Sequence, residues 1–257
     1  MTSATRTKFS IRLLRHATLV VNIRNTSFLV DPMLSPKDAM DPVGNAESKS
    51  RIPMVDLPVS NDELSKILGD VDAILVTHTH RDHWDDVAQK MINKAKPVFC
   101  QPADLEKIKG QGFTDVHAIE DTASFKGITI HRTGGQHGTG EIGQRMGTVS
   151  GFVLEAAGES LYIAGDTIWC AEVEEALNKF KPQTTVVNAG GAQFLTGDPI
   201  TMSAADVLKV STFKTRVVAV HMDTVNHCKV TREVLRNYLQ EKDKTGLVFI
   251  PADGSKV

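Results

Sequence analysis

Thr77-His78-Thr79-His80-Arg81-Asp82-His83-Trp84 places four metal-competent side chains within six positions of the chain. Neutral imidazole suits zinc, and a carboxylate adds a harder ligand with negative charge. The apolar, β-branched run at 71–76 predicts a buried strand before this motif, and residues 85–92 predict an amphipathic helix after it. The motif then forms a tight turn at the end of a core strand, where His78 and His80 can face one ion while Asp82 and His83 face a second. The alternative is a histidine-rich surface turn.

The overall composition is that of a soluble globular protein. The 257 residues are 41% hydrophobic and 23% charged, which fits one α/β domain over residues 1–257. With 29 basic and 31 acidic residues the net charge is −2, so we expect neither a nucleic-acid nor a membrane partner. Three widely separated cysteines predict no disulfide framework. Residues 1–15 lack the apolar core of a signal peptide and no run reaches membrane-spanning length, so we expect a cytoplasmic protein.

The first sixty residues divide into a strand-rich part and an irregular part. A β-meander is predicted over Ile11–Leu14, Thr18–Ile23 and Ser27–Asp31, and Asp31 could face the site. His16 lies between the first two strands, and taken alone it is interpreted as a satisfied structural histidine. Residues 33–60 carry several prolines and methionines without any period. A loop of this length is interpreted as a lid, as a subunit contact of a homo-oligomer or as an ordered surface loop.

Helices and further strands are predicted after this loop. The expected helices are Ser60–Leu68, opened by a Ser60–Glu63 capping box, then Ala103–Lys109, Ala171–Phe180, Ser203–Phe213 and Thr231–Lys242. Further strands are expected at Pro97–Cys100 and Leu247–Ile250.

Four later strand-like runs each end in a polar group. Gly127–Ile130 leads to His137, Leu161–Gly165 to Asp166, Thr185–Val187 to Asn188, and Val217–Val220 to His221. Ligand sites of α/β sheets gather outside the carboxyl ends of the strands, so these groups are candidates for the same site. Taken singly, each has a simpler explanation, such as a structural histidine or, for Asp166, a helix cap.

Together these residues resemble the ligand set of the metallo-β-lactamase superfamily. The resemblance covers nearly the whole chain and implies an α/β protein with a four-layer αββα sandwich and a dinuclear metal site on one edge. By this resemblance His78, His80 and His137 would hold the first metal, Asp82, His83 and His221 the second, and Asp166 would bridge them. Two zinc ions are expected, with manganese or iron as alternatives.

Shorter motifs are similar to the ascorbate-6-phosphate lactonase-like (UlaG-like) branch of the superfamily. These motifs are Arg15-His16-Ala17-Thr18, Leu29-Val30-Asp31-Pro32, Asn188-Ala189-Gly190-Gly191-Ala192-Gln193 and His221-Met222-Asp223-Thr224-Val225-Asn226-His227. The isothiocyanate hydrolases of plant-associated bacteria are another match among related small hydrolases.

The function implied is hydrolysis of a small electrophilic substrate by a metal-bridging hydroxide. Asp82 would orient the nucleophile by resemblance, and His227 would either donate to developing negative charge or be structural. Trp84, Met146, Trp169, Phe194 and Met222 lie beside site segments, as packing residues or as the wall of an apolar pocket. The favoured substrate is an isothiocyanate, releasing amine and carbonyl sulfide, although Arg81, Arg132 and Arg145 could serve a phosphate.

Several other functions remain as alternatives. A lactonase or phosphodiesterase-type zinc hydrolase would use the same metals, and an iron-dependent oxidoreductase would use the same fold. A nuclease is disfavoured by the balanced charge. A non-catalytic metal-binding protein would leave the complete ligand set unexplained.

Overall fold

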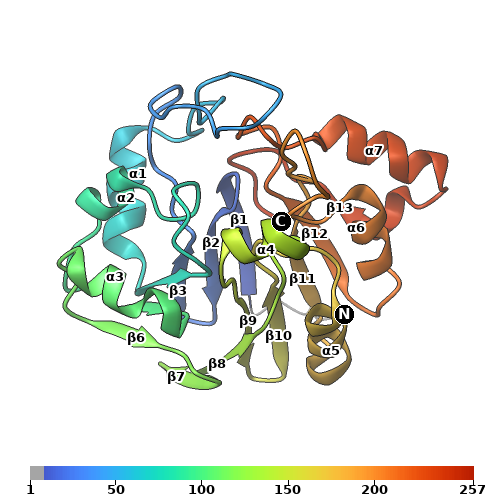
Figure 1. The fold of residues 1–257 in the computed structure, drawn as a ribbon. Helices are drawn as coiled ribbons and strands as arrows, with labels where there is room; N and C mark the ends of the chain where they lie inside the picture. Colours follow the sequence, from blue (N-terminus) through green and yellow to red (C-terminus); the bar gives the residue numbers. More distant parts are fainter. Residues whose placement is uncertain (1–8) are drawn as a thin grey trace.

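Two β-sheets lie face to face in the computed structural model, which describes residues 9–257 (Figure 1). The first sheet has the order β1-β2-β3-β4-β5-β6 and contains β1 (Phe9–Arg15), β2 (Thr18–Ile23), β3 (Thr26–Val30), β4 (Ala73–Val76), β5 (Val98–Cys100) and β6 (Val116–Ala118). The second has the order β13-β12-β11-β10-β9-β8-β7 and contains β7 (Thr122–Phe125), β8 (Ile128–Thr133), β9 (Gly151–Ala156), β10 (Glu159–Ile163), β11 (Thr184–Asn188), β12 (Arg216–Val220) and β13 (Val248–Phe249). The part of the sequence interpretation that concerns residues 1–8 lies outside the described residues.

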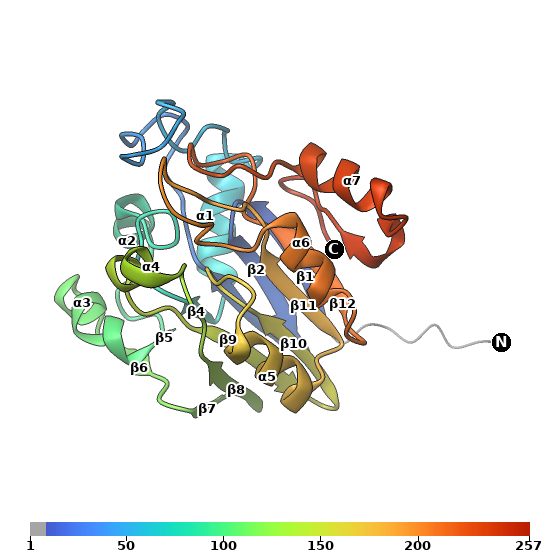
Figure 2. The same ribbon diagram turned by 45° about the vertical axis from the view of Figure 1, so that its right-hand side comes forward.

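Helices cover the outer face of each sheet, as Figure 2 shows from a second side. The first sheet carries α1 (Asn61–Asp70), α2 (Asp86–Met91), the 3₁₀ turn Pro102–Asp104 and α3 (Leu105–Gly110). The second sheet carries α5 (Ala171–Phe180), α6 (Ala204–Val210), α7 (Arg232–Glu241) and the 3₁₀ turn Thr245–Leu247. A short helix α4 (Gly140–Met146) follows β8. The four-layer αββα prediction is therefore confirmed.

Three apolar clusters follow from this layering. The inward residues of both sheets, such as Leu75, Phe152 and Ile163, form the central core. The outer faces pack against the helices, with Val187 and Leu235 in one cluster and Ile74 and Leu64 in the other. β4 and β11 are buried along their whole length, which explains the continuous apolar sequence of β4.

The capping box predicted at Ser60 and Glu63 is only half formed in the structure. The Ser60 hydroxyl accepts the Glu63 backbone N–H as a capping box requires, but the Glu63 carboxylate accepts from Arg12 at 2.6 Å. The reciprocal box is found instead at Ser203 and Asp206, where α6 begins.

Some elements were not predicted from the sequence. Strands β6 and β7 are short and mostly half-exposed, so they carry little apolar periodicity. Strand β9 pairs with β10 through the turn at Ala157-Gly158, and its Phe152-Val153-Leu154 run was a usable signal. Helix α4 buries none of its residues, so no amphipathic pattern marks it.

The last described residues run antiparallel along the edge of the first sheet. The Val257 N–H donates to the Ile11 carbonyl at 2.8 Å, and the Leu13 N–H donates to the Ser255 carbonyl at 3.0 Å. The Arg12 side chain donates to the Gly254 carbonyl, so β1 has a partner on both sides. Within residues 9–257, no helix is long and apolar enough to cross a membrane.

Candidate metal centre

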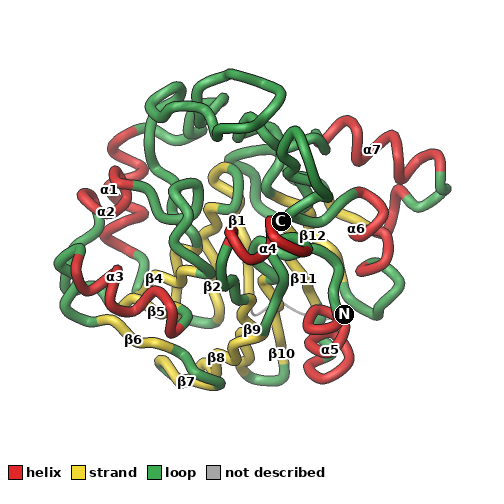
Figure 3. Tube along the Cα trace, in the orientation of Figure 1, coloured by secondary structure: helices red, strands yellow, loops and turns green. Residues whose placement is uncertain are grey.

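The ends of four strands meet at one edge of the sandwich, where loops gather in Figure 3. β10, β11 and β12 run parallel, and β8 has the same direction because it is separated from β10 by antiparallel β9. The turn after β4 reaches the same edge from the first sheet. All seven side chains that the sequence suggested as metal ligands are brought together there, in overlapping groups of buried or half-buried residues.

The first group contains His78, His80 and His137. His78 Nε2 lies 3.0 Å from His80 Nδ1. His137 Nδ1 lies 2.7 Å from the Ile200 carbonyl and therefore donates to it, which leaves His137 Nε2 unprotonated and facing Asp166 Oδ2 at 3.6 Å. This tautomer is the one that a metal ligand requires.

The second group contains His16, Asp82, His83 and His221, of which the last three are the ligands expected from the sequence. His83 Nε2 lies 3.2 Å from His221 Nε2, and Asp82 Oδ2 lies 3.7 and 3.6 Å from these two nitrogens. Ligand atoms about 2.1 Å from one tetrahedral ion lie about 3.4 Å apart, so these separations fit a zinc-sized ion. The donor set therefore fits a second metal in size and in chemistry.

Asp166 lies between the two groups. Its Oδ2 is 3.9 Å from His78 Nε2 and 3.2 Å from His83 Nε2, while its Oδ1 is 3.3 Å from His221 Nε2. Asn188, at the end of β11, donates to Asp166 Oδ1 at 2.6 Å and fixes the carboxylate. This geometry suits a bridging ligand better than a helix cap.

Asp31 supports the second group from behind, at the end of β3. Its Oδ2 lies 2.9 Å from His83 Nδ1, and its carboxylate also accepts the Thr77 N–H and hydroxyl at 2.7 Å. A carboxylate behind a histidine holds the ring in the tautomer and orientation that metal binding needs. The expectation that Asp31 faces the site agrees with the structure.

His16 differs from the sequence interpretation. It is fully buried in the second group, with Nε2 3.1 Å from Asp82 Oδ2 and its ring centroid 3.7 Å from that of His221. Its Nδ1 has no hydrogen-bond partner among the described residues, so it is not a satisfied structural histidine. The motif Arg15-His16-Ala17-Thr18 did not reveal these contacts, because the partners of His16 are distant in the chain.

The buried charges of the cluster explain why it suits a cation. Burial raises the pKa values of Asp82 and Asp166, but the neighbouring histidines outweigh it and hold both values well below the ordinary range. Burial lowers the pKa of His83, but Asp166, Asp82 and Asp31 outweigh it and raise the value to about 10. A proton on His83 supplies the positive charge that these carboxylates need, and a dication held by the same atoms would replace it.

A cavity of about 180 Å³ opens onto both groups. It is lined by Val43, His80, Arg81, Asp82, His137, Met146, Asp166, Phe194 and His227. Met146 and Phe194 thus contribute to the wall, whereas Trp84 and Met222 are buried in the cores and Trp169 packs against the helical layer of the second sheet. Of the three arginines considered for a phosphate, Arg81 is the one that lines this cavity.

His227 lies on the wall of this cavity, with its ring stacked on Phe194 at 5.9 Å between centroids. Burial lowers the pKa of His227 to about 4, so the ring is neutral at pH 7. Its Nδ1 is buried without a partner among residues 9–257, which favours the tautomer with the proton on Nε2. His227 is therefore a neutral donor beside the metal groups.

The loop at residues 33–60 forms part of the same wall. Arg15 is fully buried and donates to the carbonyls of Met33, Ser35 and Val55, which ties the two ends of the loop to β1. Asn226 accepts the Val43 N–H at 2.8 Å and donates to the Val43 carbonyl at 3.1 Å. The loop is thus held against the cavity as an ordered wall.

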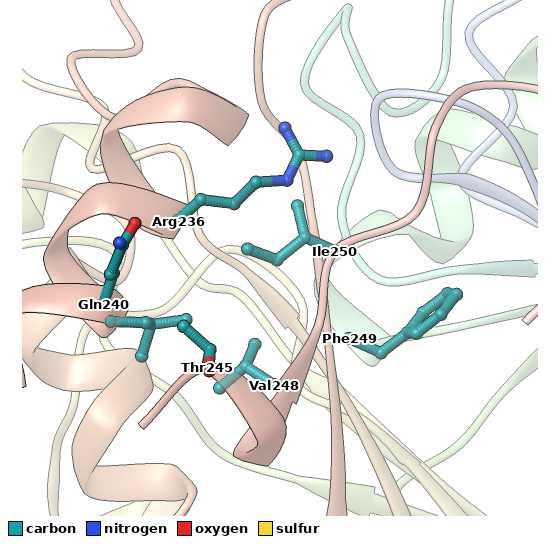
Figure 4. Close-up of a pocket in the computed structure, with 7 residues that line it drawn as sticks. Arg236, Gln240, Thr245, Val248, Phe249 and Ile250 are labelled. Atoms are coloured by element: carbon teal, nitrogen blue, oxygen red, sulfur yellow. The ribbon is translucent and has the colours of Figure 1, made fainter. Parts of the chain in front are cut away.

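A larger hollow of about 340 Å³ lies away from the cluster, between α7 and β13 (Figure 4). Its lining includes Arg236, Gln240 and Phe249, and it contains no histidine, cysteine or carboxylate. The smaller cavity, and not this one, carries the groups needed for chemistry.

Several known proteins are similar to this chain in sequence and fold. Residues 26–222 match a family model described as "Beta-lactamase superfamily domain". The UPF0173 protein YddR of Bacillus subtilis (strain 168) is 37% identical over 251 residues, which is 95% of this chain and 98% of that protein. The structure of "a possible metal-dependent hydrolase" from Veillonella parvula DSM 2008 is 39% identical with a TM-score of 0.92, covering 96% of this chain and 98% of the other. The structure of an isothiocyanate hydrolase from Delia radicum gut bacteria is 36% identical with a TM-score of 0.90, covering 97% and 98%.

The sandwich and its histidine–aspartate cluster are those of a metal-dependent hydrolase with the metallo-β-lactamase fold. Within the beta-lactamase superfamily, the chain belongs to the UPF0173 family of metal-dependent hydrolases.

Proposed function

We propose that this protein is a dinuclear zinc hydrolase that cleaves a small isothiocyanate. The observation that carries the dinuclear assignment is the position of Asp166, whose two oxygens lie 3.2–3.9 Å from nitrogens of both histidine groups. His78, His80 and His137 would hold one ion, and Asp82, His83 and His221 the other. Imidazole and carboxylate donors at these separations suit zinc, with manganese or iron as the alternatives.

Two bound zinc ions would lower the pKa of a water molecule toward neutrality and withdraw charge from the substrate. Asp82 belongs to the second group and also lines the cavity, so its carboxylate can orient that water and receive its proton. His227 faces the same space as a neutral ring with Nε2–H, and can donate to negative charge that develops on the substrate. The two side chains therefore have opposite roles, one as a proton acceptor and one as a donor.

The cavity supports a small and partly apolar substrate. Val43, Met146 and Phe194 supply its apolar wall, and Arg81 is the cationic side chain in the lining. An isothiocyanate has an electrophilic carbon between nitrogen and sulfur, and addition of one water releases a primary amine and carbonyl sulfide. The isothiocyanate hydrolase of similar structure, at 36% identity over nearly the full length, supports this substrate class.

The test begins with the metal content of the purified full chain. The zinc-loaded protein is then offered an allyl and an aryl isothiocyanate, a lactone and a phosphodiester. We expect two zinc ions per chain and amine release from an isothiocyanate. Turnover of only the lactone or the phosphodiester would contradict the isothiocyanate assignment but keep the hydrolase. Bound iron with oxygen uptake and no hydrolysis would contradict the assignment as a hydrolase.

The role of Asp82 is tested by Asp82→Asn, which removes the proton acceptor and one negative charge. We expect kcat to fall by about 10²–10⁴-fold, as for loss of a general base. Asp86→Asn is the matched control, because it is the same substitution at an exposed position of α2, four residues later in the chain. Full activity of Asp82→Asn would sink the proposed mechanism.

A further inference from the structure

His16 is the one member of the second group that the proposed metal set does not use. The ligand atoms of His16, Asp82, His83 and His221 all lie within 4.8 Å of one another. The His16 side chain is fully buried, and its Nε2 lies 3.1 Å from Asp82 Oδ2. A fourth polar side chain in so small a space must interact with the other three.

The backbone fixes His16 against His221. The His221 N–H donates to the His16 carbonyl at 2.9 Å, and the two ring centroids lie 3.7 Å apart with the ring planes tilted by 36°. Both residues have left-handed backbone conformations, with φ of 61° for His16 and 68° for His221. Such conformations are costly for residues with a Cβ and persist where surrounding contacts determine them. The position of the His16 ring relative to the second group is therefore rigid.

The neighbours of the His16 ring decide which nitrogen carries the proton. Nδ1 is buried and has no partner among the described residues, so a proton there would leave an unsatisfied buried donor, which is unfavourable. A proton on Nε2 instead meets Asp82 Oδ2 at 3.1 Å. The favoured tautomer thus makes His16 a hydrogen-bond donor to Asp82, and leaves no Nε2 lone pair for a metal.

We propose that His16 is a positioning residue for the second metal site: its Nε2–H holds the Asp82 carboxylate between His83 and His221, and so raises the affinity for the second ion while leaving the first unaffected. This inference rests on the dinuclear site of the proposed function, but it does not depend on the substrate. His16 contacts none of His78, His80 or His137 through a hydrogen bond or ring contact found among the described residues, so the first site should not respond.

The experiment is a cobalt(II) titration of the metal-free full chain, followed by absorption spectroscopy and chelator competition. His16→Phe removes the donor and keeps a ring on His221. His16→Gln places an amide nitrogen near the former Nε2, whereas His16→Asn places it near Nδ1. Circular dichroism and melting verify that each variant is folded, and if His16→Phe is not, the Gln and Asn pair carries the test.

We expect His16→Phe and His16→Asn to lower the affinity for the second cobalt ion by about 10–100-fold, as the loss of a hydrogen bond to a ligand does at other metal sites. The first ion should keep its affinity within about twofold, and His16→Gln should retain most of the second. Asn188→Leu is the contrasting variant, because Asn188 holds the bridging Asp166 and its loss should weaken both ions together.

Three outcomes in the His16 variants would overturn the proposal. One is an unchanged second affinity in His16→Phe, and another is an equal loss at both sites in all three His16 variants. The third is X-ray absorption showing one nitrogen fewer around cobalt in His16→Phe, which would make His16 a ligand. Binding of only one ion by the wild-type protein would contradict both this proposal and the dinuclear site of the proposed function. Two ions without isothiocyanate turnover would refute only the substrate.

Discussion

Asn226 provides the sharpest test of how the wall of the cavity is held in place. It is almost fully buried, and its amide makes three hydrogen bonds to the loop at residues 33–60. It accepts the Val43 N–H at 2.8 Å and donates to the carbonyls of Val43 at 3.1 Å and Ser48 at 2.7 Å. Asn226→Ala removes all three bonds while leaving the cluster side chains in place.

The magnitude follows from these bonds. At about 1 kcal/mol for each hydrogen bond, the loop segment around Val43 should lose about 3 kcal/mol of local stability. Since 1.4 kcal/mol corresponds to a factor of ten, the open state of this segment should become about 150-fold more populated. The global free energy of unfolding should fall by no more than the same amount, because the sheets and helices do not depend on Asn226.

The assay is hydrogen exchange measured by mass spectrometry on peptides that contain the Val43 amide. Arg51→Ala is the matched control, because Arg51 also makes three contacts within this loop, to Asp38, Ala39 and Asp41, but on the exposed side. Exposed pairs contribute little, so the control should change exchange by less than about fivefold. The reasoning is refuted if Val43 exchanges equally fast in wild type and Asn226→Ala, or if both variants accelerate it alike.

Two further predictions concern stability. A Cβ on Gly190 would lie 2.4 Å from the His221 carbonyl oxygen and 2.5 Å from Cys228 Sγ, so Gly190→Ala should cost about 1–3 kcal/mol and lower Tm by roughly 2–4 °C per kcal/mol. Gly69→Ala on α1 meets nothing within 4 Å and should leave Tm unchanged or slightly higher; equal melting of the two variants would contradict the packing argument. Burial raises the pKa of the Cys100 thiol to about 12, so the folded state keeps a proton that the unfolded state releases above pH about 8.5. Stability should therefore be full below pH 8 and fall by about 1.4 kcal/mol per unit as pH rises toward 12, and Cys100→Ala should flatten that slope in denaturant unfolding at pH 8, 9 and 10; parallel slopes would refute it.

Much of the fold and of the cluster could be predicted because the decisive signals are local. The Thr77–Trp84 motif carries its ligands at a strand end, and the apolar runs before Asp166 and His221 end at the same edge of the sandwich. Periodicity also placed α5 at Ala171–Phe180, the same bounds that the structure has. Local order and strand direction together were sufficient to bring these residues into one site.

The remainder depends on contacts that are distant in sequence. His16 appears as an isolated turn residue until the fold places it on Asp82 and His221. Val43 becomes part of the cavity only because Asn226 binds its backbone from another loop. No spacing rule relates such pairs, since they are set by how the two sheets pack.

The pairing of the chain's last described residues with β1 has a consequence for biosynthesis. Arg12 and Gly254, which bond to each other, are 242 residues apart in the chain. At about 5–20 residues per second, the ribosome needs roughly 12–48 s to supply the second after the first. Throughout that interval the outer edge of β1 lacks its neighbour, and His16 lacks His221 for most of it. A nascent chain that has not yet reached Gly254 therefore has an unpaired outer edge on β1, although it can already contain every residue of the metal centre.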